Sequence, residues 1–274
     1  MNLASTSLTS LSSSITLNSG TSIPAIGLGV YKIPNGESTE QAVLWALSAG
    51  YRHIDTASFY GNEESVGAAL RKSTIPREEI FLTTKLWPTD FFSAEKACAT
   101  SLKKLGTTYI DLYLIHWPSP VGKDRAWKSL VRLQQSGLCK AIGVSNYSIA
   151  QLQALEKSST ILPAVNQIEC SPFRIQKELR EYCQAKNIQI EAYSPLTRGQ
   201  KLFDPRITAL AAAYRKTNAQ ILIRWSLQHG MIVLPKSRTQ HRIAENIAVF
   251  DFEISKTDME SLDGLNENYK ALFK

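Results

Sequence analysis

Short apolar runs recur along the chain, separated by longer segments whose apolar residues follow helical spacing. Eight runs have the length of a strand: residues 25–32, 51–56, 80–85, 110–116, 141–145, 164–169, 188–194 and 231–235. Several of them, such as residues 110–115, are almost continuously apolar rather than alternating with polar residues. Continuous runs are typical of strands buried on both faces. The pattern therefore predicts a parallel sheet that is covered on both sides.

The segments between these runs carry helix start signals. Residues 38–40 (Ser-Thr-Glu), 93–96 (Ser-Ala-Glu-Lys) and 218–220 (Asn-Ala-Gln) open three of them, and residues 148–155 form another. Crossovers of helical length join parallel strands through right-handed connections. Eight strand–helix units predict an α/β fold of the (β/α)8 or TIM-barrel type. An open doubly wound sheet is the competing architecture, because the pattern alone does not establish closure.

Two features precede the first predicted barrel strand. Residues 1–14 are rich in Ser and Thr without any charged side chain, and we expect a flexible extension. This segment resembles a transit peptide but lacks the expected Arg. Asn18-Ser19-Gly20 predicts the turn of a β-hairpin that could plug the barrel bottom. No long linker follows, so residues 15–274 are expected to form a single barrel domain.

Composition narrows the class of protein. The net charge of +7 is spread along the chain without a basic stripe interleaved with aromatics, which argues against a nucleic-acid partner. No run approaches the roughly 18–20 apolar residues that span a bilayer, so we expect a soluble protein without a membrane partner. The cysteines are widely spaced, which fits neither disulfides nor a metal site. We therefore expect a cytoplasmic protein, taken as a monomer, with free thiols at Cys98, Cys139, Cys170 and Cys183.

Polar residues gather where the predicted strands end. In a β/α barrel the active site lies at the carboxyl ends of the strands, and buried charge is costly unless it is paired. The pattern therefore predicts a site that binds a small molecule at this end of the barrel. The residues are Asp55, Lys85, His116, Ser145, Asn146, Gln167, Tyr193, Ser194, Lys236 and Ser237.

Several motifs in order resemble those of one known family. They are GYRHIDTASFYGNE at residues 50–63, TKLW at 84–87, DLYLIHWP at 111–118, GVSN at 143–146, VNQIE at 165–169, AYSPL at 192–196 and PKS at 235–237 followed by Arg242, Glu245 and Asn246. Together they resemble the aldo-keto reductases from about residue 15 to the C-terminus. The resemblance implies NADPH-dependent reduction of a carbonyl group on a β/α barrel.

The resemblance also implies a catalytic tetrad of Asp55, Tyr60, Lys85 and His116. A phenol is a poor acid at neutral pH, so the ammonium of Lys85 is expected to lower the pKa of Tyr60 and favour proton donation. Asp55 would hold Lys85, and neutral His116 would orient the carbonyl oxygen. Each of these residues also has a purely structural alternative. Tyr60 could be a surface tyrosine and His116 a core histidine. Asp55 and Lys85 could form an ion pair that is only structural. His53, two residues before Asp55, is assigned a structural role.

The cofactor residues are likewise implied by the resemblance. No G-x-G-x-x-G motif follows a strand, so a Rossmann-type site is not expected. A nicotinamide would stack on Tyr193, with its amide held by Ser145, Asn146 and Gln167. The planar fork of Arg242 suits the adenosine 2′-phosphate, which predicts NADPH over NADH. The remaining cofactor residues implied are Ser194, Leu196, Lys236, Ser237, Glu245 and Asn246.

Substrate choice is less accessible from the sequence. Val30, Tyr31, Trp87 and Trp117 occupy positions that line the family's substrate pocket, which predicts an aromatic-walled cleft. The loops are short, as in compact microbial members that act on diketo sugar acids, glyoxals and small aldehydes. We therefore expect a carbonyl substrate among small aldehydes, α-dicarbonyls, keto esters or sugars. The alternatives are a regulatory subunit similar to potassium-channel β subunits and a Schiff-base lyase or isomerase that uses Lys85.

Overall fold

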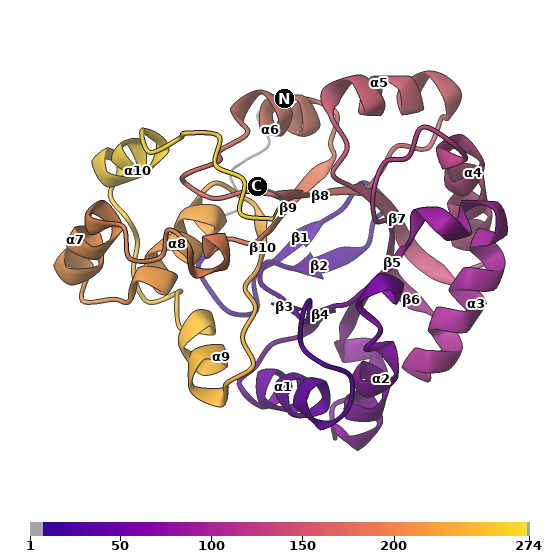
Figure 1. Cartoon of the computed structure of the whole chain (residues 1–274), viewed down its shortest axis with the longest axis horizontal. Helices are drawn as coiled ribbons and strands as arrows, with labels where there is room; N and C mark the ends of the chain where they lie inside the picture. Colours follow the sequence, from indigo (N-terminus) through magenta and orange to yellow (C-terminus); the bar gives the residue numbers. More distant parts are fainter. Residues whose placement is uncertain (1–7, 273–274) are drawn as a thin grey trace.

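The computed structural model describes residues 8–272, and Figure 1 shows helices surrounding a central ring of strands. Eight strands form one parallel sheet in which each strand pairs with its neighbours in chain order. They are β3 (Leu28–Gly29), β4 (His53–Asp55), β5 (Phe81–Leu86), β6 (Ile110–Ile115), β7 (Cys139–Ser145), β8 (Val165–Glu169), β9 (Gln189–Tyr193) and β10 (Ile232–Leu234).

The last strand, β10, pairs with the segment that precedes the first strand, β3, and this pairing closes the ring. Ile26 forms a parallel bridge with Val233. The N–H of Gly27 donates to Val233 O at 3.0 Å, and the N–H of Val233 donates to Ala25 O at 2.9 Å. An open doubly wound sheet would leave both of these edges unpaired. The predicted (β/α)8 barrel is therefore confirmed.

Helices cover the outer face of the ring (Figure 1). Apolar residues of the strands' outer faces pack against them, with Trp127 and Trp225 among the largest fully buried side chains. The helices are α1 (Glu37–Ser48), α2 (Glu63–Lys72), α3 (Ala94–Leu105), α4 (Lys123–Gln135), α5 (Ile149–Ser158), α6 (Lys177–Ala185), α7 (Pro205–Tyr214), α8 (Asn218–Gln228), α9 (Gln240–Ile247) and α10 (Lys256–Asp263).

The first barrel strand is much shorter than the apolar run that predicts it. Only Leu28 and Gly29 of the run at residues 25–32 form the strand. The run ends early because Lys32 adopts a left-handed backbone conformation, with φ of 59°. At its start, Gly27 lies against His53, where a Cβ would come within 2.6 Å of Nδ1. A side chain at position 27 would therefore displace His53 from the barrel interior.

A two-stranded hairpin closes the lower end of the barrel. Strands β1 (Ser14–Thr16) and β2 (Ser22–Pro24) pair antiparallel, with Ile15 opposite Ile23. Fully buried Ile23 packs on apolar side chains inside the barrel, among them Leu112. Asn18 in the turn donates to the carbonyls that precede β8 and β9, at 3.0 and 3.1 Å. Figure 1 shows both strands across the centre of the ring, so the predicted position of the hairpin is confirmed.

The extension expected at residues 1–14 falls partly on residues 1–7, which lie outside the described residues. In the described part, the side chain of Leu8 is buried. The carbonyl of Leu8 accepts a hydrogen bond from Arg224 at 3.0 Å. Among residues 8–272, no helix combines the length and the apolar character needed to cross a bilayer.

Candidate active site

A cleft of about 970 Å³ opens at the carboxyl ends of the barrel strands. Most of the predicted site residues line it, so the fold brings together side chains as far apart in the sequence as Tyr31 and Asn246. Lys85 is the exception among the catalytic candidates, because it lies fully buried beneath the cleft floor. The predicted residues in the lining are Tyr31, Asp55, Tyr60, Trp87, His116, Trp117, Ser145, Asn146, Gln167, Tyr193, Ser194, Leu196, Lys236, Ser237, Arg242, Glu245 and Asn246.

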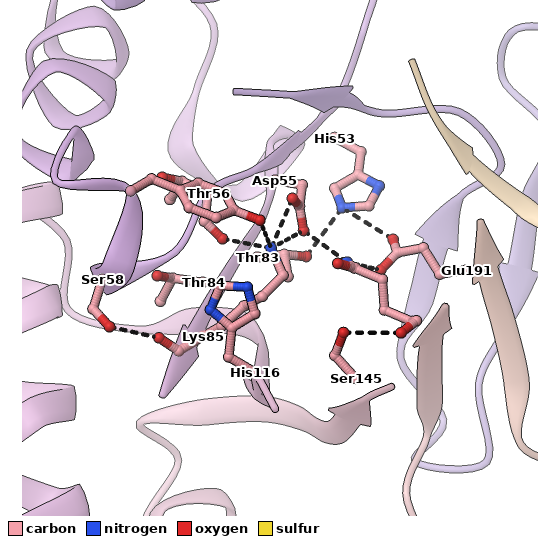
Figure 2. A network of polar contacts seen from close by, with 12 residues as sticks. His53, Asp55, Thr56, Ser58, Thr83, Thr84, Lys85, His116, Ser145 and Glu191 are labelled. Carbon is pink, nitrogen blue, oxygen red and sulfur yellow. Dashed lines mark hydrogen bonds and ion pairs between the residues drawn. The ribbon is translucent and has the colours of Figure 1, made fainter. Parts of the chain in front are cut away.

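The ammonium of Lys85 is fixed by three acceptors from neighbouring segments. It donates to Asp55 at 2.7 Å, to the carbonyl of Thr56 at 2.8 Å and to the hydroxyl of Tyr60 at 3.3 Å. Figure 2 shows the first two contacts converging on the nitrogen from β4 and the segment that follows it. An ammonium has three hydrogens to donate, so all are used here. The phenol oxygen of Tyr60 accepts from Lys85, which leaves its own O–H available to the cleft.

The pKa of Tyr60 differs from the expectation. Burial, followed by the negative charge of Asp55, raises the pKa of Tyr60 well above its ordinary value. The sequence argument considered only the ammonium of Lys85 and omitted the desolvation that an enclosed barrel imposes. The phenol therefore stays protonated at neutral pH but is a weaker acid than the sequence argument expected.

His116 follows β6 and stands at the centre of an aromatic group. Its ring is edge-on to those of Tyr60 and Trp87, at centroid distances of 5.4 and 5.1 Å. Burial, and then the charge of Lys85, lowers the pKa of His116 to about 2, so the imidazole is neutral. Phe59 stacks on Trp87 at 4.0 Å and is 52% exposed, so it extends the aromatic wall toward the cleft entrance.

A chain of hydrogen bonds joins the polar side chains at the ends of β7, β8 and β9. The hydroxyl of Tyr193 donates to Asn146 at 2.8 Å, and Asn146 donates to the hydroxyl of Ser145 at 3.0 Å. Ser145 in turn donates to the backbone carbonyl of Gln167 at 2.8 Å. Both Asn146 and Ser194 have positive φ, at 65° and 52°, because the chain turns sharply as it leaves each strand. Amide and hydroxyl groups held in this way suit a planar carboxamide.

Cations gather at one end of the cleft without carboxylate partners. Lys236, Arg238 and Arg242 line it, and none of the three forms an ion pair among the described residues. Burial, and then the nearby charges of Arg238, Arg198 and Lys32, lowers the pKa of Lys236. Cations that repel one another in this way favour a bound anion. The same cleft therefore holds cations that suit phosphate groups and amide and hydroxyl groups that suit a carboxamide.

The start of α9 adds backbone donors to this end of the cleft. Neither Ser237 nor Thr239 caps the helix through its side chain. Instead the hydroxyl of Ser237 accepts from the N–H of Thr239 at 3.2 Å, ahead of the helix. The first N–H groups of α9 therefore have no side-chain cap and suit an anionic group. Further along, buried Asn246 lines the cleft, and Glu245 accepts from Thr217 at 2.8 Å.

Val30 does not belong to the cleft wall, and we correct that expectation. Its side chain is fully buried in the core formed with α1 and α2. Its carbonyl accepts a hydrogen bond from Asn62 at 3.0 Å. The side chain of Val30 therefore belongs to the core and not to the cleft wall.

Several cleft or sub-cleft residues were missed by the sequence reasoning. Phe59, Arg198 and Phe203 lie in loops or short turns whose path follows no periodic pattern. Glu191 could have been found, because it precedes Tyr193 by two positions and therefore shares its face of β9. His53 is fully buried, and its Nε2 lies 3.0 Å from the hydroxyl of Thr83, as a structural role requires.

Known proteins resemble the chain along nearly its whole length. The model of the aldo/keto reductase family matches residues 25–267. Glyoxal reductase of Bacillus subtilis is 45% identical, and the match covers 96% of each chain. A solved aldo/keto reductase of Brucella melitensis superposes with a TM-score of 0.89 at 47% identity, over 93% of this chain and 99% of that one. An aldo-keto reductase of Bombyx mori in complex with NADP gives 0.90 at 38% identity, over 96% of each. The chain therefore belongs to the aldo/keto reductase family and is an oxidoreductase.

Proposed function

We propose that this enzyme reduces small aldehydes and α-dicarbonyl compounds to alcohols with NADPH, and that Tyr60 is the proton donor. The observation that carries the proposal is the contact of the Tyr60 hydroxyl with the ammonium of Lys85, at 3.3 Å on the floor of the cleft. The 45% identity with a glyoxal reductase supports an α-dicarbonyl among the substrates.

The buried residues account for the proton in this reaction. When bound, the nicotinamide cofactor supplies a hydride to the carbonyl carbon. Tyr60 donates its phenol proton to the carbonyl oxygen as negative charge develops there. Lys85 stabilises the phenolate that remains, and Asp55 keeps Lys85 in place at 2.7 Å. The neutral ring of His116, in the tautomer protonated on Nε2, donates to the same oxygen and orients it.

The aromatic wall favours compact, partly apolar substrates. Trp87 and Phe59 stack beside His116, and Trp117 and Tyr31 also line the cleft. These side chains exclude water from the reacting carbonyl while leaving the entrance open. Keto esters and open-chain sugars fit the same description and are further candidate substrates.

Arg242 supports NADPH as the preferred cofactor. It lies in the cleft beside two other cations, and its guanidinium can bind a phosphate through two hydrogen bonds. NADH lacks the adenosine 2′-phosphate and cannot use this contact. The 38%-identical Bombyx mori protein was solved in complex with NADP, which also supports the proposal.

The structure argues against Lys85 as a Schiff-base nucleophile. Such a lysine needs a free, neutral amine that substrate can reach. Lys85 is fully buried, and its three hydrogens are donated to Asp55, Thr56 and Tyr60.

We further propose a cytoplasmic, monomeric enzyme. The free thiols of all four cysteines support the reducing compartment.

The test is a spectrophotometric assay of NADPH and NADH oxidation with methylglyoxal, an aromatic aldehyde, a keto ester and an open-chain sugar. We expect turnover of the α-dicarbonyl and the aldehyde with NADPH, and much weaker turnover with NADH. Absence of turnover with every carbonyl, in a chain that still binds NADPH, would favour the regulatory-subunit alternative.

A further inference from the structure

A second buried carboxyl lies beneath the cleft, beside the Asp55–Lys85 pair. Glu191, on β9, is fully buried in the barrel interior. Its carboxyl faces His53 and Asp55 from β4 and Gln167 from β8, while Lys85 on β5 acts on it electrostatically. Figure 2 shows Glu191 and His53 on the side of the network away from Ser58. The proposed reaction gives Glu191 no role, so a buried carboxyl remains unexplained.

The direct polar contact of Glu191 is with the side-chain amide of Gln167. The amide nitrogen lies 2.6 Å from Oε2 of Glu191 and 2.9 Å from Oδ2 of Asp55. An amide nitrogen donates two hydrogens, whereas the amide oxygen only accepts. Two carboxyl oxygens therefore hold the nitrogen below the cleft and exclude the amide oxygen from that position.

The oxygen of the Gln167 amide is consequently directed elsewhere. Gln167 lines the cleft, and its side-chain oxygen accepts no hydrogen bond from any group in residues 8–272. A flipped amide would bring this oxygen against Oδ2 of Asp55, which repels it, and against Oε2 of Glu191, which has no hydrogen to donate when the proton of the acid is on Oε1. Asp55 alone would fix the orientation of the Gln167 amide less strongly, because it also accepts a hydrogen bond from Lys85. Glu191 is the acceptor whose hydrogen bond is made to the amide alone.

The protonation of Glu191 is compatible with this arrangement. Burial, and then the charge of Asp55, raises the pKa of Glu191 to about 8, so the acid is neutral at pH 7. Oε1 has no hydrogen-bond partner among the described residues, and it lies 3.7 Å from Nε2 of His53. With its proton on Oε1, the acid presents Oε2 to Gln167 as a pure acceptor. It does so without placing a second negative charge under Tyr60.

We propose that Glu191 is a positioning residue that holds the amide of Gln167 with its oxygen toward the cleft. There this oxygen accepts a hydrogen bond from the NH₂ group of the cofactor carboxamide and so favours cofactors that carry this group. The inference rests on the proposed function, because it requires a nicotinamide cofactor. It assigns to a residue outside the tetrad the orientation of a group that touches the cofactor.

The test compares two probes that differ only at the carboxamide. NADP⁺ carries an amide NH₂, and its 3-acetylpyridine analogue carries a methyl group in the same place. Binding of each is followed by quenching of tryptophan fluorescence in the wild-type chain, in Glu191→Gln and in Glu191→Met. Glutamine keeps a neutral acceptor at this position, whereas methionine has a similar shape without one. Glu191→Ala serves as a second acceptor-deleting variant if Glu191→Met does not fold.

We expect the wild-type chain and Glu191→Gln to bind NADP⁺ about tenfold more tightly than the analogue, the usual scale of one hydrogen bond. In Glu191→Met the ratio should fall below about threefold, through loss of affinity for NADP⁺. Circular dichroism and melting curves identify a variant that has lost its fold. A merely structural role would weaken both probes equally.

The possible failures are distinguishable. An unchanged ratio in folded Glu191→Met, or an equal loss for both probes, overturns the positioning role while the proposed function stands. A wild-type chain that binds NADP⁺ and the analogue equally well also overturns the positioning role alone. A wild-type chain that binds neither probe overturns the proposed function and this inference together.

Discussion

At the scale of single residues, the cleft floor depends on one buried ammonium and the groups that share it. Lys85 is charged and fully buried, and its Nζ is surrounded by a carboxylate, a carbonyl and a phenol. Removing one partner of such a pair leaves the other charge buried without compensation. Substitution of a single residue in contact with Lys85 is therefore expected to lower the catalytic rate strongly.

The first prediction concerns the proton donor. Tyr60→Phe removes the phenol hydroxyl and should reduce kcat for aldehyde reduction by about 10²–10⁴-fold, the scale of general acid catalysis. Affinity for NADPH should remain near that of the wild type, since the ring is kept. The measurement is steady-state kinetics together with a fluorescence titration of NADPH. Tyr113→Phe is the matched control, because that buried hydroxyl has no hydrogen-bond partner among the described residues. Retention of most of the rate in Tyr60→Phe would end the assignment.

The second prediction concerns cofactor choice. Arg242→Ala should weaken NADPH binding by about 1.5–3 kcal/mol, the scale of a charge-assisted hydrogen bond, and should barely change NADH binding. Isothermal titration calorimetry with both cofactors measures the difference. Arg242→Lys is the control that keeps the charge and removes the planar fork, and its loss should be intermediate. Equal losses for NADPH and NADH would refute the contact with the 2′-phosphate.

The residue scale also shows what the sequence could and could not predict about the site. Asp55, Lys85 and His116 were accessible because they lie at or just after the ends of apolar strands, and Gln167 because it is a polar residue within one. The direction of the Tyr60 pKa was not, because it depends on how deeply the closed barrel buries the phenol. Arg198 and Phe203 were not predicted either, since loop geometry determines whether they reach the cleft.

At the scale of secondary-structure elements, the barrel depends on its hairpin as well as on its strands. Ile23 of β2 is fully buried against apolar side chains at the lower end of the barrel. The turn that positions this strand contains Gly20 with φ of 81°, a conformation that glycine adopts without strain. The hairpin therefore contributes to the core although it lies outside the ring.

The third prediction tests this contribution. Ile23→Ala should lower the free energy of unfolding by about 2–4 kcal/mol, the usual range for a large-to-small change in a core. Activity per folded molecule should be unchanged, because the site lies at the opposite end of the strands. Urea denaturation and kinetics measure the two quantities. Ser19→Ala, in the exposed turn, is the control. A loss below about 0.5 kcal/mol would show that the hairpin is not part of the core.

Apolar runs predicted the existence of all eight barrel strands, but their ends less well. The run at residues 110–116 matches β6 closely, because every residue from Ile110 to Ile115 is buried. The run at residues 25–32 yields only two strand residues, because the backbone turns at Lys32. Periodicity records burial, whereas strand ends depend on local backbone angles that apolar composition does not specify.

At the scale of the whole molecule, buried ionisable groups couple stability to pH. Burial raises the pKa of Glu191 to about 8, whereas it lowers the pKa values of His53 and His116 to about 3 and about 2. The groups facing Glu191 are His53, Asp55 and Lys85. The two kinds of shift act with opposite sign, and their pH windows overlap between about 4.5 and 6.5.

The fourth prediction follows from these signs. Above about pH 4.5 the unfolded chain releases the Glu191 proton that the folded chain retains up to about pH 8, so Glu191 makes stability fall as pH rises through this window. The histidines make stability fall as pH drops below about 6.5. Glu191→Gln should therefore gain on the order of 2 kcal/mol relative to the wild type between pH 5 and pH 8. Urea denaturation at both pH values measures this gain. A constant difference would contradict a protonated Glu191.

The hairpin across the bottom of the barrel also determines from which end reactants can enter. Leu17 and Ile23 fill the lower end, so reactants reach Tyr60 through the upper mouth. A cofactor and a substrate that enter through the same opening cannot pass each other within the cleft. Whichever of them occupies the deeper position has to arrive first and depart last, so the architecture favours compulsory order in the catalytic cycle.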